Sequence, residues 1–279
     1  MIFSLWAIPW RTLSSVPAAD AYAITADTTL NIPAAGVLTN DGDVEGDPPE
    51  PDPEPDPFAR SLERDFKGAR IAWSKDLGGR PIDAENSRVT ESQRHVFENL
   101  GMIVEDDEPD LSTTDQIFQT IRAYIFAMQH ETHLRDHRDK VKQTVIWNAE
   151  QGMKLSAAEL GKAEQLRTEL YQQLMKFFDK YEFLAMPVTS VPPFSIELEY
   201  PTDINGIELE TYLDWMWPCY TISVTALPAI SVPAGFTKDG LPVGLQLVGR
   251  PRGEMGLLQL ARAFEGETNF YKQRPGVVN

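Results

Sequence analysis

The sequence contains a single cysteine, Cys219, among its 279 residues. An internal disulfide needs a second cysteine, and a zinc site built on cysteines needs more than one, so both are excluded. Cys219 stands between Pro218 and Tyr220, and a lone cysteine is more often a small core residue than a nucleophile. We therefore interpret it as a packing residue, and we expect no cofactor.

Basic residues are scarce, because 25 Lys and Arg stand against 42 Asp and Glu and give a formal net charge of −17. A chain with this charge repels a phosphate backbone, and the sequence offers no basic stripe to hold one. We therefore expect no nucleic-acid partner.

The N-terminal run "MIFSLWAIPW" is apolar, but Arg11 ends it well short of the roughly 20 residues that a membrane-spanning helix needs. As a signal peptide it lacks a basic n-region, although "SVPAADA" offers small residues suitable for cleavage. We predict no membrane span and a cytoplasmic protein, and secretion is the alternative.

Composition divides the chain into three regions. Residues 1–40 resemble short strands and turns, residues 41–57 form an acidic, proline-rich linker, and residues 58–279 have the patterns of a mixed helix and strand domain. Repulsion between carboxylates and the missing N–H donors of proline keep such a linker extended and solvated.

Apolar runs in the third region predict strands at residues 69–74, 102–105 and 183–188. Two further strands, "PAISVPAGF" and "PVGLQLVG", are joined through Asp239-Gly240, a pair typical of a hairpin turn. The first two strands flank a helix that begins near Asp83 and ends at Gly101, which predicts a right-handed parallel unit. The fold class expected is therefore α/β, a mixed sheet covered by helices.

Three more helices are expected from their spacing and capping residues. One begins at the capping signature Ser112-x-x-Asp115, and a second at the capping box Ser156-x-x-Glu159. A closing helix buries Met255, Leu258, Leu260, Ala261 and Phe264.

Three of the four histidines, His130, His133 and His137, lie within one helical stretch. At about 100° per residue they share one side of a helix, and the i, i+4 pair suits a single metal ion. The run fails the H-E-x-x-H pattern, because Leu134 stands where the second histidine is needed. Charged neighbours favour a solvated helix face, and a metal site is the alternative.

Several motifs together resemble the C-terminal portion of the amidase signature family: "KGARIAWSKDLGG", "YEFLAMPVTSVPPF" and "PAISVPAGF…GLPVGLQLVGR". The resemblance runs from about Pro57 to Pro275. It implies a hydrolase of small-molecule carboxamides, sometimes esters, that acts through an acyl-enzyme on serine. Members of the family use a lysine, a second serine held by a cis peptide, and a nucleophilic serine in a Gly/Ser-rich loop.

The resemblance also implies that the segment around Trp215, Tyr220 and Thr221 approaches the substrate, so these three are the candidate substrate-binding residues. The alternative for the aromatic residues of this segment, Tyr212 and Trp217 included, is interior packing, because large aromatic side chains often fill cores.

The sequence departs from the family at the catalytic loop. No Gly/Ser-rich loop occurs among the 279 residues, and "LSSVP" and "DLGGRP" lack the required spacing. Lys67 and Lys75 lie in polar turns without a serine pair, and a solvated lysine is a poor base at neutral pH. We assign no catalytic residue and expect an incomplete, inactive amidase that either self-associates through exposed apolar surface or requires a complementing N-terminal half.

A second resemblance precedes the linker. "DAYAITADTTLNIPAAGVLTNDGDVEGD" (residues 20–47) is similar to the opening strands of bacterial Ig-like or cadherin-like tandem repeats. It is too short for a sandwich of about 100 residues. It implies a chimera joined near "PDPEPDP", and as an alternative function a non-catalytic binding or cell-surface module.

Overall fold

The structure, a computed structural model, describes residues 15–16, 42–43 and 57–273. The chain divides into two units, Met1–Arg60 and Ser61–Asn279. In the first unit, β1 (Ser15–Val16) and β2 (Gly42–Asp43) pair as a two-residue antiparallel bridge, and η2 (Pro57–Ala59) is a single turn. The Ig-like segment and the acidic linker otherwise lie outside the described residues, so neither receives support.

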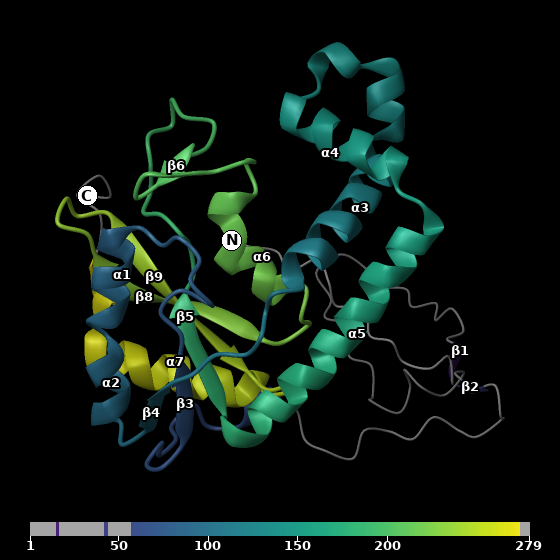
Figure 1. The fold of residues 1–279 in the computed structure, drawn as a ribbon. Coiled ribbons are helices and arrows are strands. Elements are labelled where there is room, and N and C mark those ends of the chain that lie inside the picture. Colours follow the sequence, from purple (N-terminus) through teal and green to yellow (C-terminus); the bar gives the residue numbers. More distant parts are fainter. Residues whose placement is uncertain (1–14, 17–41, 44–56, 274–279) are drawn as a thin grey trace, which may run out of the picture. The chain divides into compact units, whose positions relative to one another are not determined.

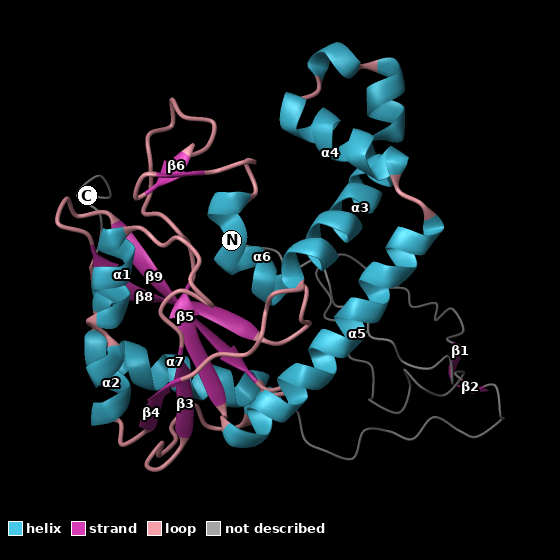
Figure 2. Cartoon of the chain, in the orientation of Figure 1, coloured by secondary structure: helices cyan, strands magenta, loops and turns pink. Residues whose placement is uncertain are grey.

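The second unit is built on a five-stranded mixed sheet in the order β4-β3-β5-β9-β8 (Figures 1 and 2). Its strands are β3 (Arg70–Trp73), β4 (Ile103–Asp106), β5 (Phe183–Pro187), β8 (Ala229–Phe236) and β9 (Pro242–Gly249). β3 pairs in parallel with β4 and β5, whereas β9 is antiparallel to β5 and β8. The expected α/β fold is confirmed, and all five strands fall where the apolar runs predict them.

Helices cover both faces of this sheet. They are α1 (Ala84–Glu91), α2 (Arg94–Asn99), α3 (Thr114–Asp136), α4 (Gln143–Lys154), α5 (Ala157–Lys180), α6 (Trp217–Ser223) and α7 (Glu254–Thr268). Short pieces connect them: η3 (Arg138–Lys140), β6 (Asp203–Ile204), β7 (Ile207–Glu208), η4 (Asp214–Met216) and η5 (Phe270–Lys272).

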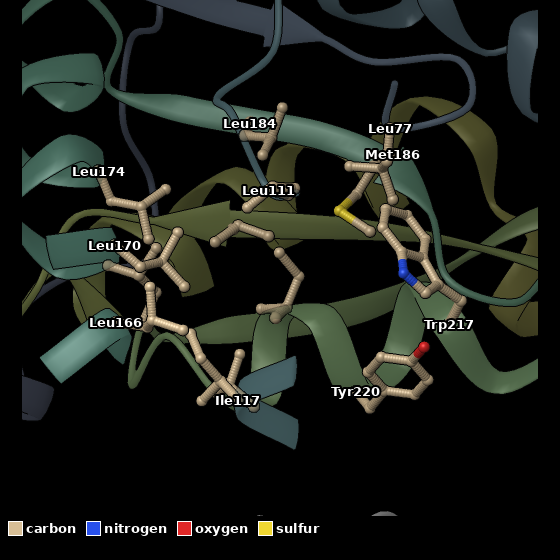
Figure 3. Close-up of a cluster of buried hydrophobic side chains, with 14 of the residues drawn as sticks. Leu77, Leu111, Ile117, Leu166, Leu170, Leu174, Leu184, Met186, Trp217 and Tyr220 are labelled. Carbon is tan, nitrogen blue, oxygen red and sulfur yellow. The ribbon is translucent and has the colours of Figure 1, made fainter. Parts of the chain in front are cut away.

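The central strand β5 is buried along its whole length and separates two apolar cores. Phe183 and Ala185 point into the core under α1, α2 and α7, whereas Leu184 and Met186 point into the core under α3, α5 and α6. This is the alternation expected of a strand whose successive side chains face opposite sides. Figure 3 shows the second core, in which leucines of α5 lie opposite Leu184.

Two helix starts follow the sequence signals. The Asp83 side chain accepts a hydrogen bond from the Glu85 amide at 2.8 Å and caps α1. At α5, Ser156 and Glu159 form a reciprocal capping box. The helix expected from Asp83 to Gly101 is instead two helices, broken at residues 92–93. The Ser92 hydroxyl bonds the Val89 carbonyl at 2.7 Å, and such local bonds compete with the helical ladder.

Two details of the expected helices are wrong. α3 begins at Thr114, and its N-cap residue makes no side-chain capping bond. In α7, Leu257 is buried while Leu258 is 38% exposed, because the inward face is formed by Leu257, Leu260, Ala261 and Phe264.

α4 is not expected from the sequence, and it packs against the distal half of α3 to form a helical arm (Figure 1). Gly152 lies at the crossing, where a β-carbon would come within 1.9 Å of the Ala123 carbonyl oxygen. The arm has its own small core of Leu134, Ile146 and Ala149. Within the described part of the chain, no helix is both long and apolar enough to cross a membrane.

Candidate functional site

The carboxyl ends of the parallel strands β3, β4 and β5 meet at one edge of the sheet, which we term the carboxyl edge. Ligands of open α/β sheets bind outside this end of the strands. Ser74 and Arg80 follow β3, Glu108 and Asp115 follow β4, and Val188 follows β5. α6 reaches the same edge, because the Cys219 thiol donates to the Val188 carbonyl at 2.9 Å.

Asp115 is the centre of a polar cluster at this edge. Its Oδ1 atom accepts hydrogen bonds from Trp217 Nε1 at 2.7 Å and from the Tyr220 hydroxyl at 2.8 Å. Its Oδ2 atom pairs with the Arg80 guanidinium, which also lies 4.5 Å from the centre of the Trp217 ring. Figure 3 shows Trp217 and Tyr220 together, beside Met186. One carboxylate therefore joins α3, α6 and the segment that follows β3.

Tyr220 acts in this cluster as a hydrogen-bond donor. Burial, and next the negative charge of Asp115, raise the pKa of its hydroxyl far above the ordinary value. The hydroxyl therefore stays protonated at any physiological pH. The ring stacks on Phe118 with centroids 4.2 Å apart and planes within 7°, so Tyr220 is fixed on both sides.

Cys219 shows the properties of a packing residue. Burial raises the pKa of its thiol, so the thiolate that a nucleophile requires is disfavoured. The thiol instead spends its proton on the Val188 carbonyl.

The candidate substrate-binding residues differ in exposure. Trp215 is half-buried and meets Phe194 edge to face, with centroids 5.3 Å apart. Tyr220 is 5% exposed and Thr221 is fully buried, where it shares a hydrogen bond with the Thr114 hydroxyl at 3.3 Å. Tyr220 and Thr221 thus pack in the interior, while Trp215 keeps an accessible face, and a role in substrate binding stays a prediction for all three.

The histidines lie on the arm, remote in sequence from the strand ends. His133 and His137 are exposed, and His130 is half-buried against Phe126, with ring centroids 5.2 Å apart. Across the residues that the structure describes, no three His, Cys, Asp or Glu side chains are grouped to hold a metal ion. The metal hypothesis therefore gains no ligand set.

No serine of the described chain is hydrogen-bonded to a lysine. Lys67 and Lys75 are exposed. Ser74, which is 3% exposed at the end of β3, donates to Glu108 Oε2 at 2.5 Å and accepts from the Leu77 amide at 2.9 Å. Its hydroxyl is thereby committed to holding two segments together, so the described site contains a fixed carboxylate and donors but no activated nucleophile.

Asp115 and Arg80 are the residues that the sequence patterns did not single out for this site. Asp115 matched a capping signature, and nothing local distinguishes that use from a tertiary contact. The one available signal is position, because both residues follow parallel strands at the edge where α/β proteins bind ligands.

Comparison with known proteins gives a consistent family. Over residues 37–258 the sequence matches the family described as Amidase. An acylamidase from Rhodococcus erythropolis is 28% identical over 221 residues, covering 78% of this chain and 46% of its own. A glutamyl-tRNA(Gln) amidotransferase subunit from Lactiplantibacillus plantarum is 31% identical over 251 residues, covering 79% and 49%. Among solved structures, a bacterial aryl acylamidase of the amidase signature enzymes has a TM-score of 0.69 at 21% identity, covering 77% and 48%.

The chain spans about half the length of the curated relatives it matches. The family match begins at residue 37, inside the segment that resembles an Ig-like repeat, and ends within α7. It covers the whole sheet and the polar cluster around Asp115. The chain belongs to the Amidase family.

Proposed function

We propose that this chain is the C-terminal portion of a hydrolase of carboxamide C–N bonds and that it hydrolyses no amide by itself. The observation that carries this proposal is at the carboxyl edge. Asp115 holds Arg80, Trp217 and Tyr220 in place there, but no described serine is paired with a lysine. Acyl transfer needs an activated nucleophile and donors aimed at the oxyanion.

The full sequence supports the same proposal, because it contains no Gly/Ser-rich loop. In this view the chain supplies the substrate-side wall of a site whose reacting groups come from a complementing N-terminal half. Trp215 is the strongest candidate for substrate contact, since it is half-buried at η4, directly before α6.

The substrate class proposed is a small amide with an aromatic or acyl group. It rests on the names of relatives, an acylamidase and an aryl acylamidase. A half-exposed tryptophan suits a flat apolar group.

The first experiment measures hydrolysis of 4-nitroacetanilide and 4-nitrophenyl acetate by the purified chain, with the Rhodococcus acylamidase as positive control. We expect no turnover above buffer and no serine adduct after treatment with phenylmethylsulfonyl fluoride. Turnover that survives further purification, together with a labelled serine, would refute the proposal of inactivity.

The second experiment mixes the chain with the N-terminal half of that acylamidase. Activity that appears only on mixing supports complementation. In the mixture, Trp215→Ala should raise KM, whereas the matched change Trp147→Ala, at a tryptophan that is 40% exposed on α4, should leave KM unchanged. Equal effects of the two changes would remove Trp215 from the substrate site.

A further inference from the structure

We propose that Arg122, together with Tyr212, forms a binding site for a carboxylate that is attached to an apolar body. The site lies where α3, α4 and the segment before η4 meet. It does not depend on the proposed function, because binding is a property of the chain without turnover.

Arg122 is surrounded by aromatic rings. Its guanidinium carbon lies 4.3 Å from the centre of the Phe126 ring, 5.5 Å from that of Phe118 and 6.0 Å from that of Tyr212. Arg122 and the three rings are all half-buried, so the guanidinium is partly desolvated and still reachable. These rings would contact the apolar body of a ligand whose charged end meets the guanidinium.

Arg122 has no carboxylate partner among residues 57–273. Its one hydrogen bond runs from Nη2 to the Tyr212 hydroxyl oxygen at 3.2 Å, although a guanidinium offers five donors. Its Nε atom is buried and bonds to nothing. A half-buried charge with unused donors is costly unless it meets an acceptor.

Tyr212 has an unused donor at the same place. Its oxygen accepts from Arg122 and from Asn148 Nδ2, and Asn148 Nδ2 also bonds the Thr144 carbonyl at 3.2 Å, which fixes the orientation of the amide. With both bonds accepted, the phenolic proton of Tyr212 has no acceptor in the described chain. A carboxylate beside Arg122 would accept from the guanidinium and from this hydroxyl together.

A carboxylate fits this arrangement better than a cation or a neutral group. The sites without partners are donors, and a planar guanidinium matches a carboxylate with two parallel bonds. Phe118 connects this site to the carboxyl edge, because its ring also stacks on Tyr220. Arg122 follows Asp115 by seven residues on α3, which is about 10 Å along a helix axis.

The probe is 4-phenylbutyrate, and its neutral counterpart is 4-phenylbutyramide. Calorimetric titration of the full chain should give an affinity for the acid about tenfold or more above that for the amide, as a charge-assisted hydrogen bond implies. The acid should also shift the NMR signal of the Arg122 Nε–H group, assigned by its loss in Arg122→Lys.

Matched variants separate binding from folding. Arg122→Met should abolish the preference for the acid and Arg122→Lys should keep part of it, while circular dichroism reports whether each is folded. Arg135→Met is the control, because Arg135 lies on the same helix and pairs with Asp136 at 2.8 Å. Equal affinity for acid and amide, no binding at millimolar concentration, or an unchanged preference in folded Arg122→Lys together with Arg122→Met would overturn the proposal.

Discussion

The hydroxyl of Tyr220 donates to the carboxylate of Asp115 at 2.8 Å, and this bond joins residues 105 positions apart in the chain. Because Trp217 and Arg80 bind the same carboxylate, removing it leaves three donors without an acceptor. We expect Asp115→Ala to lower the free energy of unfolding by about 2–4 kcal/mol, measured by urea denaturation.

Tyr220→Phe is the matched control for that prediction. It removes one donor while the carboxylate keeps its other partners, so the loss should be about 1 kcal/mol. Equal losses for the two variants, or a neutral Asp115→Ala, would mean that the cluster does not hold α3 and α6 together.

Gly152→Ala should loosen the helical arm. The added β-carbon would come within 1.9 Å of the Ala123 carbonyl oxygen and 2.8 Å of the Ala127 β-carbon, and overpacking of this kind destabilises by about 1–3 kcal/mol. Gly161→Ala on α5 is the control, because nothing lies within 4 Å of its added carbon and alanine favours a helix by about 1 kcal/mol. Hydrogen exchange in α3 and α4 measures the difference, and similar exchange in both variants would contradict the close crossing.

The carboxyl group of Glu85 should titrate at unusually low pH. Hydrogen bonds from Arg88 first, and then from the Lys238 amide and ammonium, lower its pKa to about 2. Since an unfolded glutamate titrates near about 4.3, this link stabilises the fold fully above that pH and loses its effect as the pH falls toward 2. Carbon NMR titration of Glu85 measures the value. Arg88→Ala should move it up, and a midpoint near 4.3 in the unmodified chain would contradict the contacts.

The Cys219 thiol should react slowly in the folded chain. Burial raises its pKa, so the reactive thiolate is depleted and access is restricted. With 5,5′-dithiobis(2-nitrobenzoic acid) at pH 7.5, we expect a rate on the order of tenfold or more below that in urea. Cys219→Ser gives the zero signal, because the chain has no other cysteine. Equal rates with and without urea would contradict the packing role.

Apolar side chains of the segment between β5 and η4 should drive self-association. Ile196 is 97% exposed, and Leu198 and Ile207 are each more than half exposed. Sedimentation velocity should show concentration-dependent association that Ile196→Lys weakens, whereas Leu258→Lys, at an exposed leucine of α7, leaves it unchanged. A clean monomer at high concentration that binds no dye for apolar surface would contradict this prediction.

Local signals predicted the parts of the fold that local chemistry determines. The β8–β9 hairpin forms around Asp239-Gly240, where Gly240 has a φ of 80°, and the Ser156 capping box works within four residues. The arm could not be predicted this way, because α4 depends on Gly152, a poor helix former, meeting α3 closely.

The candidate site was harder to predict for the same reason. Asp115 satisfies a capping pattern on paper, but its partners come from two other segments. Arg122 and Tyr212 are 90 residues apart, and neither carries a motif. The resemblance identified the family and drew attention to the segment around Trp215, whereas tertiary contacts alone bring the polar residues together.

The position of β5 between β3 and β9 has a consequence for the order of folding. Its partner on one side is β3, at Ile71↔Phe183, with three long helices in the intervening chain. Its partner on the other side lies in a hairpin made later in synthesis. Because closing long loops is slow, the hairpin should form early and the parallel pairing last. A nascent chain released before Gly249 would therefore leave β5 with an open edge.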